Sequence, residues 1–136
     1  MLAHRLAAAV LEGEDPKSFL KRVMPSMKIM PRPEHVYYEL EAREEYDSPE
    51  DHFTDPDDAA FCHNQLARGN MWGWCCAHVM AKFTTDEGEE IVGDDWLGGC
   101  SYLSEEDFKQ PGGYYDDMKK EAYAELCKKL AKLGYK

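Results

Sequence analysis

The chain has 136 residues and carries 27 Asp and Glu against 16 Lys and Arg, which gives a formal net charge of −11. This length suits one domain with one core, and a hydrophobic fraction of 43% is enough to build it. The negative charge argues against binding to nucleic acid or to anionic membranes, and no apolar run reaches the ~18 residues that a membrane span requires.

Periodicity and capping signals predict an α+β fold, in which helices pack on a small antiparallel sheet. Asp15-Pro16 and Asp55-Pro56 each combine an N-cap residue with proline at the first helical position. We expect helices near residues 2–12, 16–24, 56–68 and 114–133, and strands near residues 34–42, 71–84 and 90–97. We expect a single domain over residues 1–136, with a helical N-terminal extension over 1–33 and an α+β core over 34–136.

Three shorter segments carry local signals. The acidic stretch from Arg43 to Asp55 predicts an irregular loop, and Gly98-Gly99 predicts the end of the third strand. Ser104 and Asp107 have the spacing of an N-cap and its capping-box acid, which predicts one helical turn from Glu105 to Lys109.

The negative charge is concentrated in one part of the chain. Residues 31–60 carry eleven Asp and Glu against two Lys and Arg, a local charge of −9. Such a segment attracts basic protein surfaces, and aromatic residues beside it are typical anchors of protein contacts. The predicted partner-binding residues are Tyr37, Tyr38, Glu39, Glu41, Glu44, Glu45, Asp47, Glu50, Asp51, Asp55, Asp57 and Asp58.

Five cysteines, an odd number at irregular spacing, indicate reduced thiols in a cytoplasm and no disulfide framework. The candidates for metal ligation are Cys62, His63, Cys75, Cys76, His78 and Cys100. They include no C-x₂-C pair, and residues at i and i+2 of a strand are about 6–7 Å apart, too far for a direct thiol–imidazole hydrogen bond. We therefore predict no metal, no cofactor and no catalytic residue. A small metal-binding or thiol enzyme centred on Cys75, Cys76 and His78 is the alternative interpretation.

Four stretches in the second half of the chain carry a family resemblance. They are Gly69-Asn70-Met71-Trp72-Gly73-Trp74-Cys75, Asp95-Trp96-Leu97-Gly98-Gly99-Cys100-Ser101-Tyr102, Ser104-Glu105-Glu106-Asp107-Phe108 and Gly112-Gly113-Tyr114-Tyr115-Asp116-Asp117-Met118. This pattern, mainly over residues 69–118, resembles an uncharacterised family of small acidic proteins encoded by bacteriophages, prophages and plasmids. The resemblance implies an accessory protein of a mobile genetic element, made in the cytoplasm of a bacterial host cell. It supplies no catalytic residues.

Charge and resemblance together favour a binding protein over an enzyme. The leading hypothesis is an acidic phage protein with an anti-defence role, an inhibitor that blocks a host defence or nucleic-acid-processing complex by occupying its basic surface as a DNA mimic. Its partner would be a basic surface of a host protein or nucleoprotein complex, with no direct contact to nucleic acid or membrane. A further alternative is a structural or regulatory module that forms a homodimer through the aromatic face of its long strand.

Overall fold

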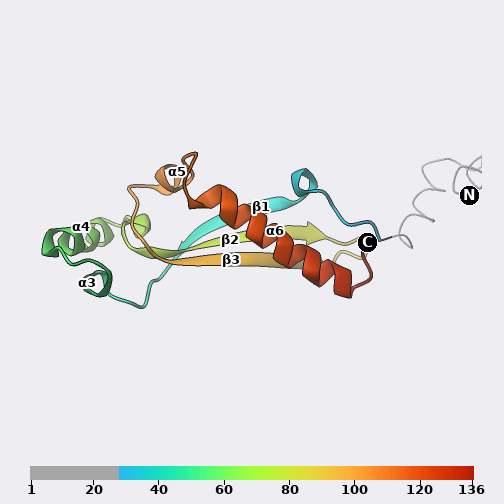
Figure 1. Ribbon diagram of the computed structural model, residues 1–136, viewed down its shortest axis with the longest axis horizontal. Coiled ribbons are helices and arrows are strands. Elements are labelled where there is room, and N and C mark those ends of the chain that lie inside the picture. Colours follow the sequence, from blue (N-terminus) through green and yellow to red (C-terminus); the bar gives the residue numbers. More distant parts are fainter. Residues whose placement is uncertain (1–27) are drawn as a thin grey trace, which may run out of the picture. The chain divides into compact units, whose positions relative to one another are not determined.

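The computed structural model describes residues 28–136, so the expected helices over 2–12 and 16–24 lie outside the described residues. Within this range the chain forms a three-stranded antiparallel sheet, four α-helices and two short 3-10 helices (Figure 1). The expected α+β class is confirmed. In chain order the elements are η2 (Pro33–His35), β1 (Tyr37–Arg43), α3 (Pro49–His52), α4 (Pro56–Ala67), η3 (Met71–Gly73), β2 (Cys75–Thr84), β3 (Glu90–Cys100), α5 (Glu105–Phe108) and α6 (Tyr114–Lys132).

The strand order is β1-β2-β3, which places β2 in the centre of the sheet. Its small alternate residues Ala77, Val79 and Ala81 are fully buried. Helix α6 runs across this face (Figure 1) and approaches it closely. A Cβ added at Gly93, the β3 partner of Ala81, would lie only 2.1 Å from the backbone nitrogen of Leu126. The small residues on this face therefore allow the helix and the sheet to pack backbone to backbone.

The first two strands begin later than expected because a short helix occupies the start of each predicted segment. Pro33–His35 forms η2, so β1 begins at Tyr37 and not at residue 34. Met71–Gly73 forms η3, which starts where the Asn70 side chain accepts a hydrogen bond from the N–H of Trp72 at 3.1 Å. The local Asx turn outcompetes the strand, and β2 begins at Cys75.

The third strand does not end at Gly98-Gly99, as the sequence predicted, but continues to Cys100. Cys75 pairs with Cys100 and Ala77 with Leu97, so Gly98 and Gly99 together oppose the single residue Cys76. This is a β-bulge, and Gly99 adopts a φ of +65°, a conformation that glycine reaches without strain.

The predicted helices in the described range are confirmed, with one addition. Helices α4 and α6 match the expected segments. Helix α5 begins with the expected N-cap, because the N–H of Asp107 donates to Ser104 Oγ at 3.1 Å. The Asp107 carboxylate accepts from the N–H of Leu103 at 3.0 Å, one residue before the N-cap, and not from Ser104 itself. The prediction of an irregular loop from Arg43 to Asp55 is wrong in its centre, where α3 forms. Pro49 at its first position and two acids in its first turn are the signals that favour this helix.

Two compact units divide the chain. One contains Pro31–Lys129, and the described residues of the other are Lys28–Met30 and Leu130–Lys136. In the latter unit the N–H of Met30 donates to the carbonyl of Lys136 at 2.9 Å, and the N–H of Lys136 donates to the carbonyl of Lys28 at 2.9 Å. Among residues 28–136, no helix combines the length and the apolar character needed to cross a membrane.

Candidate functional site

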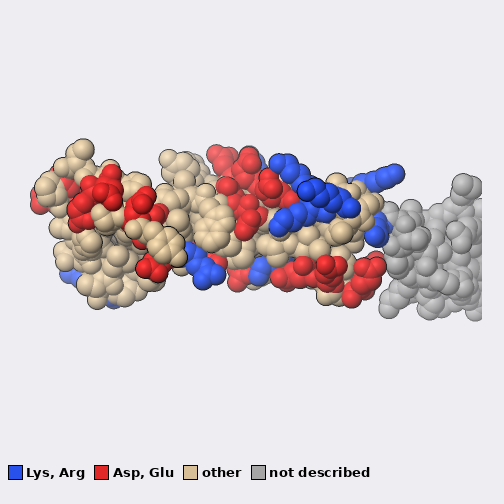
Figure 2. Space-filling model, turned by 90° about the horizontal axis from the view of Figure 1, so that it is seen from below, with Lys and Arg blue, Asp and Glu red and all other residues tan. Residues whose placement is uncertain are grey.

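The acidic part of the chain follows β1 directly. Residues 44–58, here called the acidic segment, carry eight Asp and Glu and no Lys or Arg. The segment contains the loop after β1, helix α3 and the first residues of α4. Seven of its eight carboxylate side chains belong to exposed residues, and Glu45 is half-buried. Figure 2 shows Asp and Glu side chains over the part of the Pro31–Lys129 unit that α3 and α4 form.

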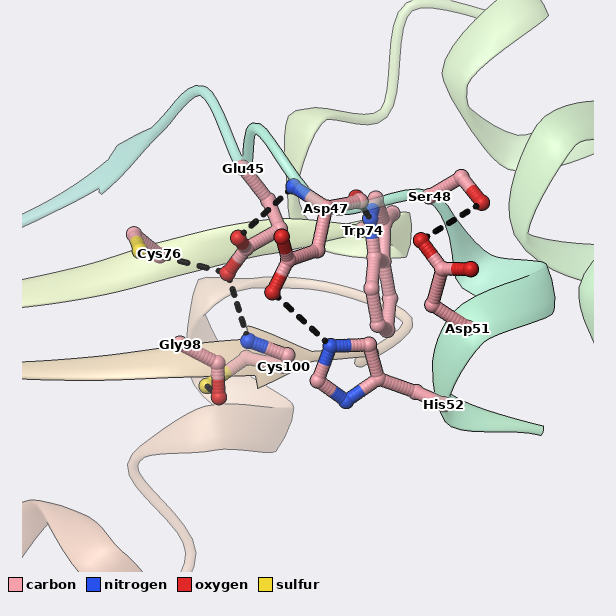
Figure 3. A network of polar contacts seen from close by, with 10 residues as sticks. Glu45, Asp47, Ser48, Asp51, His52, Trp74, Cys76, Gly98 and Cys100 are labelled. Atoms are coloured by element: carbon pink, nitrogen blue, oxygen red, sulfur yellow. Dashed lines mark hydrogen bonds and ion pairs between the residues drawn. The ribbon is translucent and has the colours of Figure 1, made fainter.

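Glu45 attaches the acidic segment to the sheet (Figure 3). Its Oε2 accepts hydrogen bonds from the backbone N–H of Gly99 at 2.7 Å and from the thiol of Cys76 at 3.3 Å. Its Oε1 accepts from the N–H of Asp47 at 3.1 Å. The bond from Gly99 is the main cause of a lowered pKa at Glu45, so the contact stabilises the charged carboxylate. The bulge in β3 thus supplies the donor that holds the segment.

The buried indole of Trp74 holds the same segment from the other side. Trp74 Nε1 donates to the backbone carbonyl of Asp47 at 2.8 Å. The indole ring also contacts the rings of His52 and Phe53, with centroid distances of 5.1 and 5.8 Å. His52 Nε2 in turn lies 3.4 Å from Asp47 Oδ2 (Figure 3). The loop and α3 are therefore wrapped around a core side chain.

Two polar contacts order the helices of the acidic segment. Glu50 Oε1 on α3 lies 2.6 Å from His63 Nε2 on α4, and the pKa of Glu50 is lowered first by its own backbone N–H and then by His63. Asp55 caps α4, because its Oδ1 accepts from the N–H of Asp57 at 2.9 Å. The carboxylates of this surface are thus presented by a fixed backbone.

The predicted partner-binding residues separate into those that build the fold and those that face solvent. Glu45 and Asp55 make the internal contacts described above. Glu44, Asp57 and Asp58 are exposed, and their carboxylates make no hydrogen bond or ion pair within residues 28–136. These three carboxylates are the members of the set most available to a partner.

Tyr37 and Tyr38 point to opposite faces of β1, so the structure does not bring both beside the acidic segment. Tyr37 is 67% exposed and pairs with Lys82 on the face away from α6. Tyr38 pairs with Ala81 on the face that α6 covers, where it lines a groove of about 560 Å³ with Lys119. Burial is the main cause of a raised pKa at Tyr38.

Glu39 and Glu41 are engaged on the face of the sheet away from α6. Glu39 forms an ion pair with Lys82, and Glu41 Oε1 lies 2.9 Å from His78 Nδ1. The hydrogen bond with His78 is the main cause of the lowered pKa of Glu41. The second ring nitrogen of His78 lies 2.9 Å from Asp94 Oδ2. These two predicted residues therefore help to hold the strands.

The alternative centre around Cys75, Cys76 and His78 lacks an activated thiol. Burial raises the pKa of Cys75 to about 12, and burial together with the hydrogen bond to Glu45 raises that of Cys76 to about 11. A nucleophilic thiol requires a lowered pKa, and the neighbouring imidazole is already engaged by two carboxylates. In the described part of the chain, no three His, Cys, Asp or Glu side chains are grouped so that they could hold a metal ion.

Two features of the site were not predicted. Tyr46, between the two fixed residues Glu45 and Asp47, is 91% exposed. The contact between Glu45 and Gly99 joins residues 54 positions apart. A glycine pair inside a strand is a signal for a bulge, but no sequence pattern identifies the carboxylate that a bulge will bind.

No protein-family model, curated protein or solved structure matches this chain. Charge, burial and side-chain contacts therefore carry the functional argument.

Proposed function

We propose that the acidic segment binds a basic surface of another protein, and that the chain thereby blocks a host defence or nucleic-acid-processing complex. The observation that carries this proposal is the charge of residues 44–58, which hold eight Asp and Glu and no Lys or Arg on an ordered backbone. Surfaces that bind nucleic acid are lined by Lys and Arg, and an array of carboxylates can occupy them in place of phosphates.

The ordered backbone is what distinguishes this surface from a solvated acidic tail. A disordered segment loses conformational entropy when it binds, whereas the contacts of Glu45, Trp74 and Asp55 fix this one beforehand. Complementary charge also accelerates the encounter with a basic partner. The family resemblance to proteins of mobile genetic elements supports a bacterial host protein as that partner.

The test uses a charge reversal that leaves the internal contacts intact. In the site variant, Glu44, Asp57 and Asp58 are all replaced by Lys. In the control, Asp86, Glu87 and Glu89 in the exposed connection between β2 and β3 are replaced by Lys, with the same change in net charge. The immobilised full chain is incubated with the proteins of a bacterial lysate that a heparin column retains.

We expect the wild type and the control to retain proteins from this pool, and DNA to release them. Retention should weaken as the Debye length falls from about 10 Å at 0.1 M salt to about 3 Å at 1 M. The site variant should lose most of the retention that the wild type shows at low salt. Retention that is indifferent to salt and to DNA, or that both variants lose equally, would rule out the acidic segment as the binding surface.

The face of the sheet away from α6 favours a second candidate, a dimerising module. Tyr37 is 67% exposed and Trp96 51% exposed on this face. Light scattering over a dilution series is the test, with Trp96→Lys as the disrupting variant. A wild-type chain that is monomeric at every concentration would eliminate this candidate.

A further inference from the structure

Tyr46 is the most exposed large hydrophobic side chain within residues 28–136, with 91% of its surface accessible. Its side chain makes no hydrogen bond, ion pair or aromatic contact in that range. Within residues 28–136 the fold therefore gains little from an aromatic residue at this position, and any specific use of the ring lies outside this range.

The backbone on both sides of Tyr46 is held in place. The carboxylate of Glu45 is bound by Gly99 and Cys76, and the carbonyl of Asp47 is bound by Trp74. A tyrosine has only two side-chain torsions to lose on binding, so a fixed backbone makes it a contact of low entropic cost. Rigidly presented tyrosines are frequent hot spots of protein interfaces.

The charges next to the ring indicate what kind of surface it fits. Glu44 and Asp47, close to Tyr46 on either side in the chain, are both exposed, so this stretch offers an aromatic ring together with two carboxylates to solvent. A single-stranded nucleic acid has the same combination, because its unstacked bases offer ring faces between anionic phosphates. A duplex keeps its bases stacked inside and presents mainly its charge.

We infer that Tyr46 acts as a base mimic, and that the partner surface is a single-strand-binding groove in which basic side chains alternate with base-stacking side chains. This inference rests on the proposed function. It adds that the partner binds single strands and that Tyr46 anchors the contact.

The experiment compares two defined pools of bacterial lysate proteins, one eluted from a single-stranded DNA column and one eluted from a duplex DNA column. Depletion of each pool is measured as a function of the concentration of the immobilised full chain. The variants are Tyr46→Ala, Tyr46→Phe and, as a control at an exposed tyrosine outside the acidic segment, Tyr114→Ala. Thermal melting checks that each variant is folded.

We expect the wild type to deplete the single-strand pool preferentially. Tyr46→Ala should weaken this depletion at least about 30-fold, the loss that marks a hot spot, while Tyr46→Phe and Tyr114→Ala stay within about threefold of the wild type. Single-stranded oligonucleotide should compete better than duplex at equal nucleotide concentration.

Two results would overturn the inference without touching the proposed function. The first is full binding by Tyr46→Ala while the Lys-substituted site variant loses binding. The second is preferential depletion of the duplex pool. Retention of neither pool by the wild type would remove the proposed function, and the role of Tyr46 with it.

Discussion

The indole ring of Trp96 lies flat against the imidazole ring of His78, with ring centroids 3.6 Å apart and planes inclined by 10°. The two residues are direct partners on β3 and β2. Trp96 shields His78, which is only 6% exposed. The imidazole nitrogens meanwhile reach Glu41 on β1 and Asp94 on β3 at 2.9 Å each. One side chain thus links all three strands on the face away from α6.

Removal of either ring should weaken the sheet. We expect Trp96→Ala to lower the free energy of unfolding by about 1 kcal/mol, and His78→Ala to lower it by about 2 kcal/mol because it also removes both carboxylate contacts. The double variant should lose less than the sum, by about 0.5–1.5 kcal/mol, since the stack can be lost only once. Urea unfolding of the four proteins measures this coupling. Strictly additive losses would mean that the stack contributes nothing.

Because α6 lies so close to Gly93, adding a single methyl group at this position should strongly destabilise the fold. A Cβ at this position would lie 2.1 Å from the nitrogen of Leu126 and 2.4 Å from the oxygen of Ala122, both backbone atoms that cannot rotate away. We expect Gly93→Ala to lower the free energy of unfolding by about 3 kcal/mol or more. Gly113→Ala is the control, because the nearest atom to its Cβ would lie at 3.3 Å. Similar losses for the two variants, measured by urea unfolding, would show that α6 does not pack on the sheet as described.

The sequence predicted the elements whose signals are local. Periodicity predicted β2 and α6, and the spacing of Ser104 and Asp107 predicted the start of α5. Strand starts were misplaced where a local side-chain contact, such as that of Asn70, competes with the sheet. A pattern of apolar residues does not reveal such competition.

The acidic segment shows the limit of a prediction based on charge. Counting carboxylates found the segment but treated its members as equivalent. Glu45 holds the loop through a backbone N–H 54 residues away, whereas Glu44 next to it faces solvent. This distinction depends on the bulge at Gly98 and Gly99, which forms only when β2 and β3 pair. Side-chain roles that arise from long-range pairing are not encoded in local composition.

The N-cap of α4 can be tested apart from its charge. Asp55→Ala removes the acceptor for the N–H of Asp57, and we expect it to lower the free energy of unfolding by about 1 kcal/mol. Asp55→Asn keeps an acceptor oxygen and removes only the charge, so it should stay within about 0.5 kcal/mol of the wild type. Thermal melting of both variants is the measurement. Equal losses would assign the effect to charge and not to the cap.

The thiol of Cys76 should be unreactive while Glu45 is present. The pKa of this thiol is raised to about 11, mainly by burial and next by the hydrogen bond to Glu45. Little thiolate therefore exists at pH 8. Glu45→Gln removes a negative charge beside the sulfur, which lowers the thiol pKa and should accelerate alkylation of Cys76 by iodoacetamide. Buried Cys62 is the internal control for global opening, and its modification should not change. Peptide mass spectrometry after timed quenching distinguishes the sites, and parallel acceleration at both would indicate unfolding instead.

Glu45 should also make stability depend on pH in a defined direction. Its pKa in the folded protein lies below the ordinary value of 4.5, mainly because of the Gly99 hydrogen bond, so the unfolded chain binds the proton more readily. The stabilisation is therefore complete above about pH 4.5 and is lost as the pH falls through the lower folded pKa. We expect Glu45→Gln to have a lower free energy of unfolding than the wild type at pH 7. This difference between the two proteins should become smaller below pH 4.5. Glu44→Gln, at an exposed carboxylate without a partner within residues 28–136, should follow the wild type at every pH. Urea unfolding between pH 3 and 7 measures the difference in free energy of unfolding between Glu45→Gln and the wild type. A difference that stays constant with pH would mean that the charged carboxylate of Glu45 does not hold the acidic segment to the sheet.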